Sequence, residues 1–210
     1  MTDLKRANKR TQKAAETRRR ILEAARDLFL DQGYGATNLQ EVAAAAGVAV
    51  QTIYFVFGNK RTLLKELVDV TIAGDDEPVA TMNRPWFRDA LATDTAAAHL
   101  AAHVRGTREI LERVARITKM VGTAATTDIE VAQLWPPGRD PRFQVQTAAA
   151  KAMVVKPGAR PGVSAEQAAD LLYALLSPEL YLLFVQERGW SSEQWEQWTY
   201  DTLLPQLCSP

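Results

Sequence analysis

The stretch from Asn38 to Lys60 constrains the fold of this chain more than any other part of the sequence. Apolar residues recur at helical spacing on both sides of Gly47. Glycine often ends a helix, because it adopts positive φ without a steric penalty. The pattern therefore predicts a short helix, a tight turn at Gly47 and a second short helix over residues 50–57. Two short helices joined by such a turn are typical of the helix-turn-helix, whose second helix enters the major groove of DNA.

The rest of the sequence also favours helices. Hydrophobic residues make up 47% of the 210 residues, which is enough for a sizeable core. Ala, Leu, Glu, Gln and Arg are frequent, and runs of β-branched residues are few and short. We therefore predict an all-α protein.

Residue patterns divide the chain into three parts. Residues 1–13 hold five Lys and Arg side chains, which predicts a basic flexible arm. Residues 14–59 are predicted to form a three-helix DNA-binding domain, in which Thr37 and Gln40 form the capping box of the second helix. Residues 60–210 are predicted to form a second helical domain.

Charge is unevenly distributed along a chain whose net charge is zero. Residues 1–65 carry 12 Lys/Arg against 6 Asp/Glu, and the remaining residues carry 13 against 19. A basic end beside an acidic remainder favours a nucleic-acid partner at the basic end. Solvated helix faces would give the same imbalance, and the charge pattern by itself does not separate the two interpretations.

Side chains of the second short helix suit direct reading of bases. Gln51 can pair with the N6 and N7 atoms of adenine, and Thr52 can hydrogen-bond to a base or contact a thymine methyl group. Val50, Phe55 and Val56 are expected to face outward, where apolar side chains contact thymine methyls. The alternative for Val56 is a place in the core.

A specific pattern of residues runs through this region. It consists of Gly33-Tyr34, Thr37, Leu39, Val42-Ala43, Ala46-Gly47-Val48, Thr52-Ile53-Tyr54, Phe57, Asn59-Lys60 and Leu63. This pattern, which covers about residues 17–65, resembles the TetR family of bacterial transcriptional repressors. The resemblance implies a homodimer that binds palindromic double-stranded DNA. It also implies a C-terminal helical domain that holds the dimer interface and a small-molecule inducer.

The resemblance and the side-chain chemistry together predict a set of DNA contacts. The residues are Gln40, Val50, Gln51, Thr52, Tyr54, Phe55 and Lys60. Two positions depart from the family pattern. Ala49 stands where a capping Ser is usual, so one helix cap is expected to be missing. Val56 stands where His or Tyr is common, so one contact with a phosphate or sugar of DNA is expected to be missing.

The predicted second domain supplies candidates for a ligand pocket and a dimer interface. Ligand pockets are mostly apolar with a few polar anchors, which predicts a pocket of Trp86, His99, His103, Met120, Trp135, Phe143 and Tyr173. The last two predicted helices form an apolar hairpin, and two hairpins across a two-fold axis would make a four-helix bundle. The predicted interface residues are Leu172, Leu176, Leu183, Trp195 and Trp198. A hairpin that covers only its own core is the alternative.

Other classes of protein fit the sequence less well. No glycine-rich phosphate loop or Ser/His/Asp arrangement is present, so we predict no catalytic residue and no cofactor. His99 and His103 lie four residues apart, but the sequence offers no neighbouring Glu or Cys ligand, so no metal is predicted. Residues 171–185 are apolar but short for a membrane span, and a single cysteine fits a reducing cytosol, so a cytoplasmic protein is expected.

Three functions remain open at this point. The prediction is a repressor that a small molecule releases from DNA. The alternatives are an architectural or activating DNA-binding protein without an inducer, and a small helical enzyme.

Overall fold

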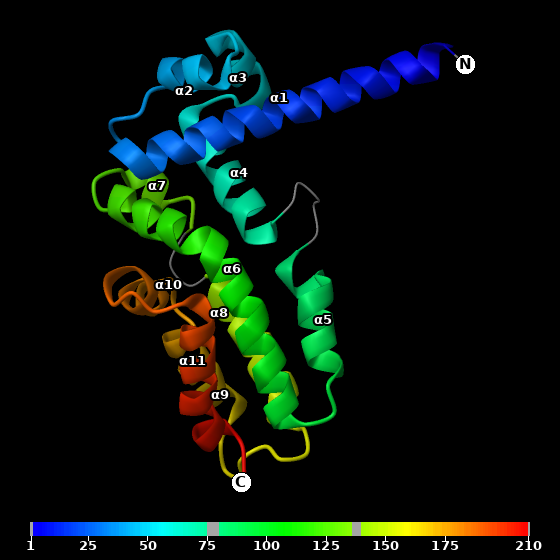
Figure 1. The fold of residues 1–210 in the computed structure, drawn as a ribbon, viewed down its shortest axis with the longest axis vertical. Helices are drawn as coiled ribbons and strands as arrows, with labels where there is room; N and C mark the ends of the chain where they lie inside the picture. Colours follow the sequence, from blue (N-terminus) through cyan, green and yellow to red (C-terminus); the bar gives the residue numbers. More distant parts are fainter. Residues whose placement is uncertain (1, 75–79, 136–139, 210) are drawn as a thin grey trace. The chain divides into compact units, whose positions relative to one another are not determined.

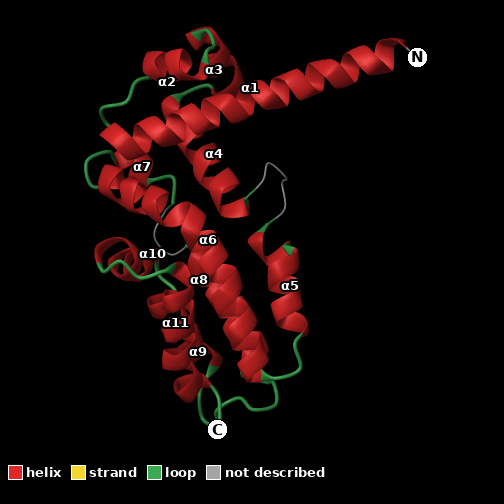
Figure 2. Cartoon of the chain, in the orientation of Figure 1, coloured by secondary structure: helices red, strands yellow, loops and turns green. Residues whose placement is uncertain are grey.

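The computed structural model describes residues 2–74, 80–135 and 140–209, with side chains from residue 11 onward. Figure 2 draws these residues as helices and connecting loops, with no strand among them. The predicted all-α class is therefore confirmed.

The chain divides into two compact units. The first unit comprises Met1–Asp69 and Met120–Leu134. It holds α1 (Thr2–Gln32), α2 (Leu39–Ala46), α3 (Val50–Phe57), most of α4 (Lys60–Ala73) and α7 (Ile129–Ala132). The helices are labelled in Figure 1.

The second unit comprises Val70–Lys119 and Trp135–Pro210. It holds η1 (Thr81–Asn83), α5 (Pro85–Ala92), α8 (Pro141–Met153), α9 (Ala165–Leu175), α10 (Pro178–Leu182), η2 (Leu183–Glu187) and α11 (Ser192–Leu207). The long helix α6 (Ala96–Ala125) contributes its first 24 residues to this unit and its last six to the first unit.

Two boundaries differ from those predicted. The expected flexible arm of residues 1–13 is described as helix from Thr2 onward, continuous with α1. The division between units falls inside α4, after Asp69, rather than before Lys60. In addition, residues 120–134 join the first unit, which the sequence did not suggest. This segment holds the end of α6 and the short α7.

The core of the first unit follows the helical spacing of the sequence. Ile21, Leu22, Ala25 and Phe29 of α1 are all buried, because the spacing i, i+1, i+4, i+8 puts them on one face of a helix. Phe29 packs on Tyr34 with ring centroids 5.3 Å apart. Buried residues of the next three helices complete this core, namely Leu39, Val42, Ala43, Ala46, Ile53, Phe57, Leu63, Leu64 and Leu67.

The helix α2 begins one residue later than predicted. Asn38, not Thr37, is the N-cap, and its Oδ1 atom accepts a hydrogen bond from the backbone N–H of Glu41 at 2.9 Å. The Glu41 side chain in turn accepts from the N–H of Asn38, which completes a capping box. Thr37 is buried, and its hydroxyl donates to the Gly33 carbonyl at 2.9 Å. As predicted, Gly47 ends α2 in the left-handed region.

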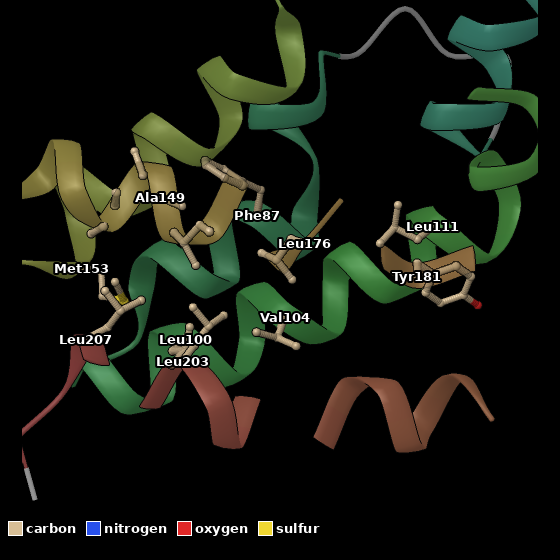
Figure 3. Close-up of a cluster of buried hydrophobic side chains, with 14 of the residues drawn as sticks. Phe87, Leu100, Val104, Leu111, Ala149, Met153, Leu176, Tyr181, Leu203 and Leu207 are labelled. Atoms are coloured by element: carbon tan, nitrogen blue, oxygen red, sulfur yellow. The ribbon is translucent and has the colours of Figure 1, made fainter. Parts of the chain in front are cut away.

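The second unit has one continuous apolar core. Figure 3 shows side chains from α5, α6, α8, α10 and α11 meeting there, together with Leu176 just beyond α9. The largest side chain buried in this core is Trp195 of α11, which packs edge-on against Tyr181.

The predicted apolar hairpin is interrupted. The apolar residues 171–185 do not form one helix, because α9 ends at Leu175 and Pro178 opens α10. Proline lacks an N–H and fits the first turn of a helix, and the Ser177 hydroxyl caps that turn by accepting from the N–H of Leu180. Capping boxes at Ser164 and Ser191 open α9 and α11.

Burial corrects the predicted dimer contacts. Leu172, Leu176 and Trp195 lie in the chain's own core with at most 1% of their surface exposed, so they cannot contact a second copy. A helix that is apolar all round gives no sign of which side faces its own chain. Leu183, which is 42% exposed, and the partly exposed Trp198 remain accessible.

Residues 165–187 have the length and apolarity of a membrane span, but 44% of the apolar 18-residue stretch within them is buried inside the protein. The break at Ser177-Pro178 also divides it into separate helices. We therefore interpret this segment as part of the apolar core.

A close contact fixes α5 against α6. Gly106 lies on the buried face of α6, and a Cβ atom added there would lie 2.1 Å from Cε3 of the Trp86 indole. The indole therefore packs directly on the helix backbone, which only glycine permits.

We predict that Gly106→Ala lowers the free energy of unfolding by about 1–3 kcal/mol, because the indole must leave this position. The matched control is Gly122→Ala in the same helix, where an added Cβ meets nothing within 4 Å. That substitution is expected to stabilise by about 0.5–1 kcal/mol through helix propensity. Urea unfolding of both variants checks the prediction. Equal effects of the two substitutions would contradict the contact.

Candidate functional site

The helix α3 presents a largely exposed surface opposite its buried side. Ile53 and Phe57, four residues apart, are the two buried residues of this eight-residue helix. Gln51, Tyr54, Phe55 and Val56 are exposed. Phe55 is 91% exposed, an unusual place for a large aromatic side chain unless it contacts another molecule. Val56 is 36% exposed, so the alternative of a core position for it is wrong.

The α3 surface combines hydrogen-bonding and apolar groups. Gln51 offers an amide that can pair with adenine, while Phe55 and Val56 offer apolar contact to thymine methyl groups. Val50 and Thr52 are partly exposed at the start of the helix, and Gln40 on α2 is exposed. The residues predicted to contact bases are therefore accessible.

The start of α3 lacks a side-chain cap, as predicted. Ala49 occupies the N-cap position with φ −71° and ψ 144°, and no side-chain hydrogen bond caps the helix. This conformation is the extended one that Ser or Thr adopts at an N-cap. The cap is therefore missing for lack of an oxygen atom.

Lys60, one of the predicted DNA contacts, has a partner inside the first unit. Its ammonium lies 4.2 Å from the centroid of the Tyr34 ring, a cation–π contact. Partial burial lowers the pKa of Lys60, while the negative charges of Asp128 and Glu41 act in the opposite direction. Burial is the main cause that raises the pKa of Tyr34, and the negative charge of Asp128 acts in the same direction.

The sequence did not predict two acidic residues that lie close to Lys60 and Arg61. Glu130 of α7 forms an ion pair with Arg61 at 2.8 Å, and Asp128 caps α7 close enough to affect Lys60. They lie about 70 residues further along the chain, and no local pattern links them to α4. We call this pair of acidic residues, Asp128 and Glu130, the α7 acidic pair.

The arginines of α1 also make contacts inside the unit. Arg18 pairs with Glu66 at 2.6 Å, and Arg19 pairs with Glu16 and Glu23 along the same helix. Arg20 is exposed and lies at one wall of a shallow groove of about 670 Å³ between α1 and α2.

A second candidate site lies on the buried face of α6. His99 and His103 are each only 1% exposed, and their ring centroids are 6.2 Å apart. The Nε2 atom of His103 lies 2.7 Å from Oε1 of Gln146 on α8. The remaining three ring nitrogens, both of His99 and Nδ1 of His103, have no hydrogen-bond partner among the described residues.

The environment keeps both imidazoles neutral. Burial lowers the pKa of His99 to about 4, and the charges of His103 and Lys156 act in the same direction. Burial also lowers the pKa of His103, against a smaller opposing effect of Gln146. Two aromatic rings complete the cluster, with centroid distances to His103 of 5.9 Å for Trp86 and 6.0 Å for Phe87. We call Trp86, Phe87, His99, His103 and Gln146 the histidine cluster.

The predicted pocket residues fall into separate groups. Trp86, His99 and His103 come together, as described above. Phe143 and Tyr173 form another pair, whose ring centroids are 5.2 Å apart and whose rings meet edge-on. The Tyr173 hydroxyl donates to Asp140, and Arg142 lies over its ring. Trp135 is partly exposed, and Met120 belongs to the first unit.

Within the described residues, no three His, Cys, Asp or Glu side chains gather where they could hold a metal ion. Cys208 is buried, and burial raises the pKa of its thiol.

Comparison with known proteins finds likeness at two scales. Residues 21–67 match the family model of bacterial regulatory proteins, tetR family. The chain is 43% identical over 65 residues to the HTH-type transcriptional regulator AcrR of Shigella flexneri, a match covering 31% of this chain and 30% of that protein. It is 41% identical over 58 residues to the regulator TtgR of Pseudomonas putida, covering 28% of each. The matched segment thus spans less than a third of these relatives.

The likeness in fold extends over nearly the whole chain. A putative transcriptional regulator from Saccharomonospora viridis, solved with choline, superposes with a TM-score of 0.69 at 20% identity and covers 93% of this chain and 100% of its own. The SmeT–triclosan complex gives 0.70 at 20% identity, with 92% of each chain covered. The FadR regulator of Bacillus subtilis, solved with stearoyl-CoA, gives 0.68 at 17% identity, with coverages of 88% and 96%.

We predict that Ala49→Ser stabilises the protein by about 1 kcal/mol, because the serine hydroxyl would accept a hydrogen bond from the first turn of α3. The control is Ala45→Ser, at an exposed position inside α2, where serine is expected to destabilise by about 0.5 kcal/mol. Thermal unfolding compares the two variants. A loss of stability in both would show that the missing side-chain cap does not limit α3.

Proposed function

Because this chain belongs to the TetR family of bacterial regulatory proteins, we propose that it is a ligand-responsive transcriptional repressor. It binds palindromic operator DNA as a homodimer in the cytoplasm, and a small-molecule inducer releases it. The single observation that carries this proposal is the exposed surface of α3.

The proposal assigns base contacts to α3. Two buried residues anchor the helix, so Gln51, Tyr54 and Phe55 can enter a major groove without disturbing the core. Val50, Thr52 and Gln40 would lie at the margin of that contact. Lys60 would reach a phosphate by leaving the Tyr34 ring.

A homodimer fits the spacing that such DNA requires. In helix-turn-helix dimers, two recognition helices enter successive major grooves about 34 Å apart. The accessible apolar groups that support an interface are Leu183 and the aromatic cluster of Phe184, Trp190 and Trp198. The centroid of the Phe184 ring lies 4.4 Å from the ring centroid of Trp190 and 4.6 Å from that of Trp198. This aromatic cluster replaces the buried leucines as the proposed dimer contact.

Ligand response requires a conformation that the ligand and DNA prefer differently. Two helices, α4 and α6, contribute residues to both units and are the proposed carriers of that change. On α6, the histidine cluster lies in the second unit, and the helix ends in the first unit just before the α7 acidic pair. That pair holds Arg61 and influences Lys60, so a shift of α6 would alter the cations available to DNA.

The similar proteins support a regulator rather than an enzyme, since AcrR, TtgR, FadR and the protein from Saccharomonospora viridis are each named as a transcriptional regulator. Three solved relatives contain choline, triclosan and stearoyl-CoA, which differ widely in size and charge. We therefore propose an inducer without taking its identity from any of them.

We predict that Gln51→Ala and Phe55→Ala each weaken binding to a DNA site selected by the wild-type protein by about ten- to a hundredfold, since one good base contact contributes about 1–3 kcal/mol. Both side chains are exposed, so the free energy of unfolding should stay within about 0.5 kcal/mol of wild type.

The matched control is Val155→Ala, which removes an 81% exposed apolar side chain in the second unit. It should leave DNA affinity unchanged in a fluorescence-anisotropy titration. If both α3 variants retain full sequence selectivity, α3 is not the recognition helix.

We predict that Leu183→Glu converts the protein to a monomer, because a charge would be buried at the proposed interface. Sedimentation velocity measures the change, and Val155→Glu serves as the control with a charge at an unrelated exposed position. Persistence of the Leu183→Glu dimer at the wild-type dissociation constant would exclude this interface.

A further inference from the structure

We propose that the histidine cluster is a binding site for an uncharged aromatic molecule that carries a hydroxyl or N–H group. The inference rests on the proposed ligand response and names the class of ligand that this site takes. The cluster draws on three helices of the second unit, α5, α6 and α8.

The spacing of the two histidines creates the site. Residues four apart lie on one face of a helix, so α6 turns both imidazoles into the interior. Buried polar atoms in folded proteins nearly always have hydrogen-bond partners. Here three ring nitrogens on adjacent side chains have none among the described residues. A hydrogen-bonding ligand would satisfy them together.

The protonation of His103 defines one hydrogen bond of the ligand. Oε1 of Gln146 accepts the hydrogen bond at 2.7 Å, so His103 carries its proton on Nε2. A neutral imidazole has only one N–H, and Nδ1 is therefore a bare acceptor. The ligand must supply a donor to it, such as a phenolic O–H or a heteroaromatic N–H. His99 adds one donor and one acceptor.

The charges around the cluster favour a neutral ligand. Neutral imidazoles offer no charge to pair with an anion, since burial disfavours protonation of His99. A cation would meet the positive charge of Lys156, whose ammonium donates to the carbonyls of Leu91 and Thr93. No acidic group contributes to the pKa shift of either histidine.

The walls of the cluster favour a flat ring. Trp86 lies at 35° to His103, and Phe87 meets it edge-on. The indole of Trp86 packs against the bare backbone at Gly106, and it is only partly buried. A planar ligand can take the place of the indole there, because Gly106 accepts a ring face and any larger residue would exclude it.

The experiment uses two pairs of probes that differ by one hydrogen-bond donor. The pairs are 2-naphthol with 2-methoxynaphthalene, and indole with 1-methylindole. Binding to the full-length protein without DNA is measured by calorimetry. Each donor compound is expected to bind at least about tenfold more tightly than its methylated partner, the factor that one hydrogen bond provides. Naphthalene-2-carboxylate and tetramethylammonium should bind more weakly than 2-naphthol.

Variants then locate the site. His103→Phe removes the Nδ1 acceptor and should abolish the preference for the donor compound, while His99→Phe should weaken binding about tenfold. Tyr173→Phe is the control, since it removes a hydroxyl from the Phe143–Tyr173 pair, which has no ring contact with the histidine cluster among the described residues. Thermal unfolding establishes that each variant folds. If a phenylalanine variant does not fold, Trp86→Phe provides the test, with altered affinity for 2-naphthol and unchanged affinity in Tyr173→Phe.

Equal binding of donor and methylated compounds, or no binding of any donor compound below about 1 mM, would overturn the proposal. So would full binding in His103→Phe. DNA release is measured separately. If 2-naphthol binds as predicted but leaves DNA affinity unchanged, the site stands and the proposed ligand response is wrong. If another compound releases DNA equally from wild type and both histidine variants, the response stands and this site is wrong.

Discussion

The burial of Ile53 and Phe57 is the interaction on which the candidate interface depends. These two side chains hold an eight-residue helix that has no side-chain cap at its start. A helix of this length is unstable in isolation, and its stability comes from packing. Because only one narrow face is buried, the opposite face can carry Gln51, Tyr54 and Phe55 at no cost to the core. Phe55 is 91% exposed and adds nothing to the core, so it is free to contact another molecule.

The α7 acidic pair lies close to two cations of the same unit. Lys60 and Arg61, at the start of α4, lie beside the α3 surface in sequence and would face phosphates in a complex with DNA. In the structure described here, Tyr34 and Glu130 are their partners. The Arg61–Glu130 ion pair is exposed, and exposed ion pairs contribute little to stability, so Arg61 can exchange this contact for a phosphate contact at small cost. The helix α6 carries the two histidines of the histidine cluster and ends just before this acidic pair. In the proposed mechanism, a ligand that shifts α6 would change the charge presented by α4 through this acidic pair.

The parts of this structure that follow from local pattern could be predicted from the sequence. The turn at Gly47, the uncapped Ala49 and the capping boxes at Ser164 and Ser191 depend on residues within a few positions of one another. Contacts across long sequence separations could not be predicted. The Arg61–Glu130 pair, for example, spans 69 residues. The one-residue error in the α2 cap had a local cause instead, because Thr37 is buried and its hydroxyl donates to the Gly33 carbonyl four residues earlier. Leu172 and Leu176 were misassigned because apolar residues on every side of a helix leave its orientation undetermined.

The most direct test of the account is hydroxyl-radical footprinting of the protein on DNA selected from random sequence. A dimer that reads DNA through α3 should protect two half-sites on one face of the duplex, with centres about one helical turn, or 34–36 Å, apart. The two half-sites should be inverted repeats, since a two-fold symmetric dimer presents identical helices to both. Protection of a single half-site, or uniform protection without sequence preference, would contradict the central claim.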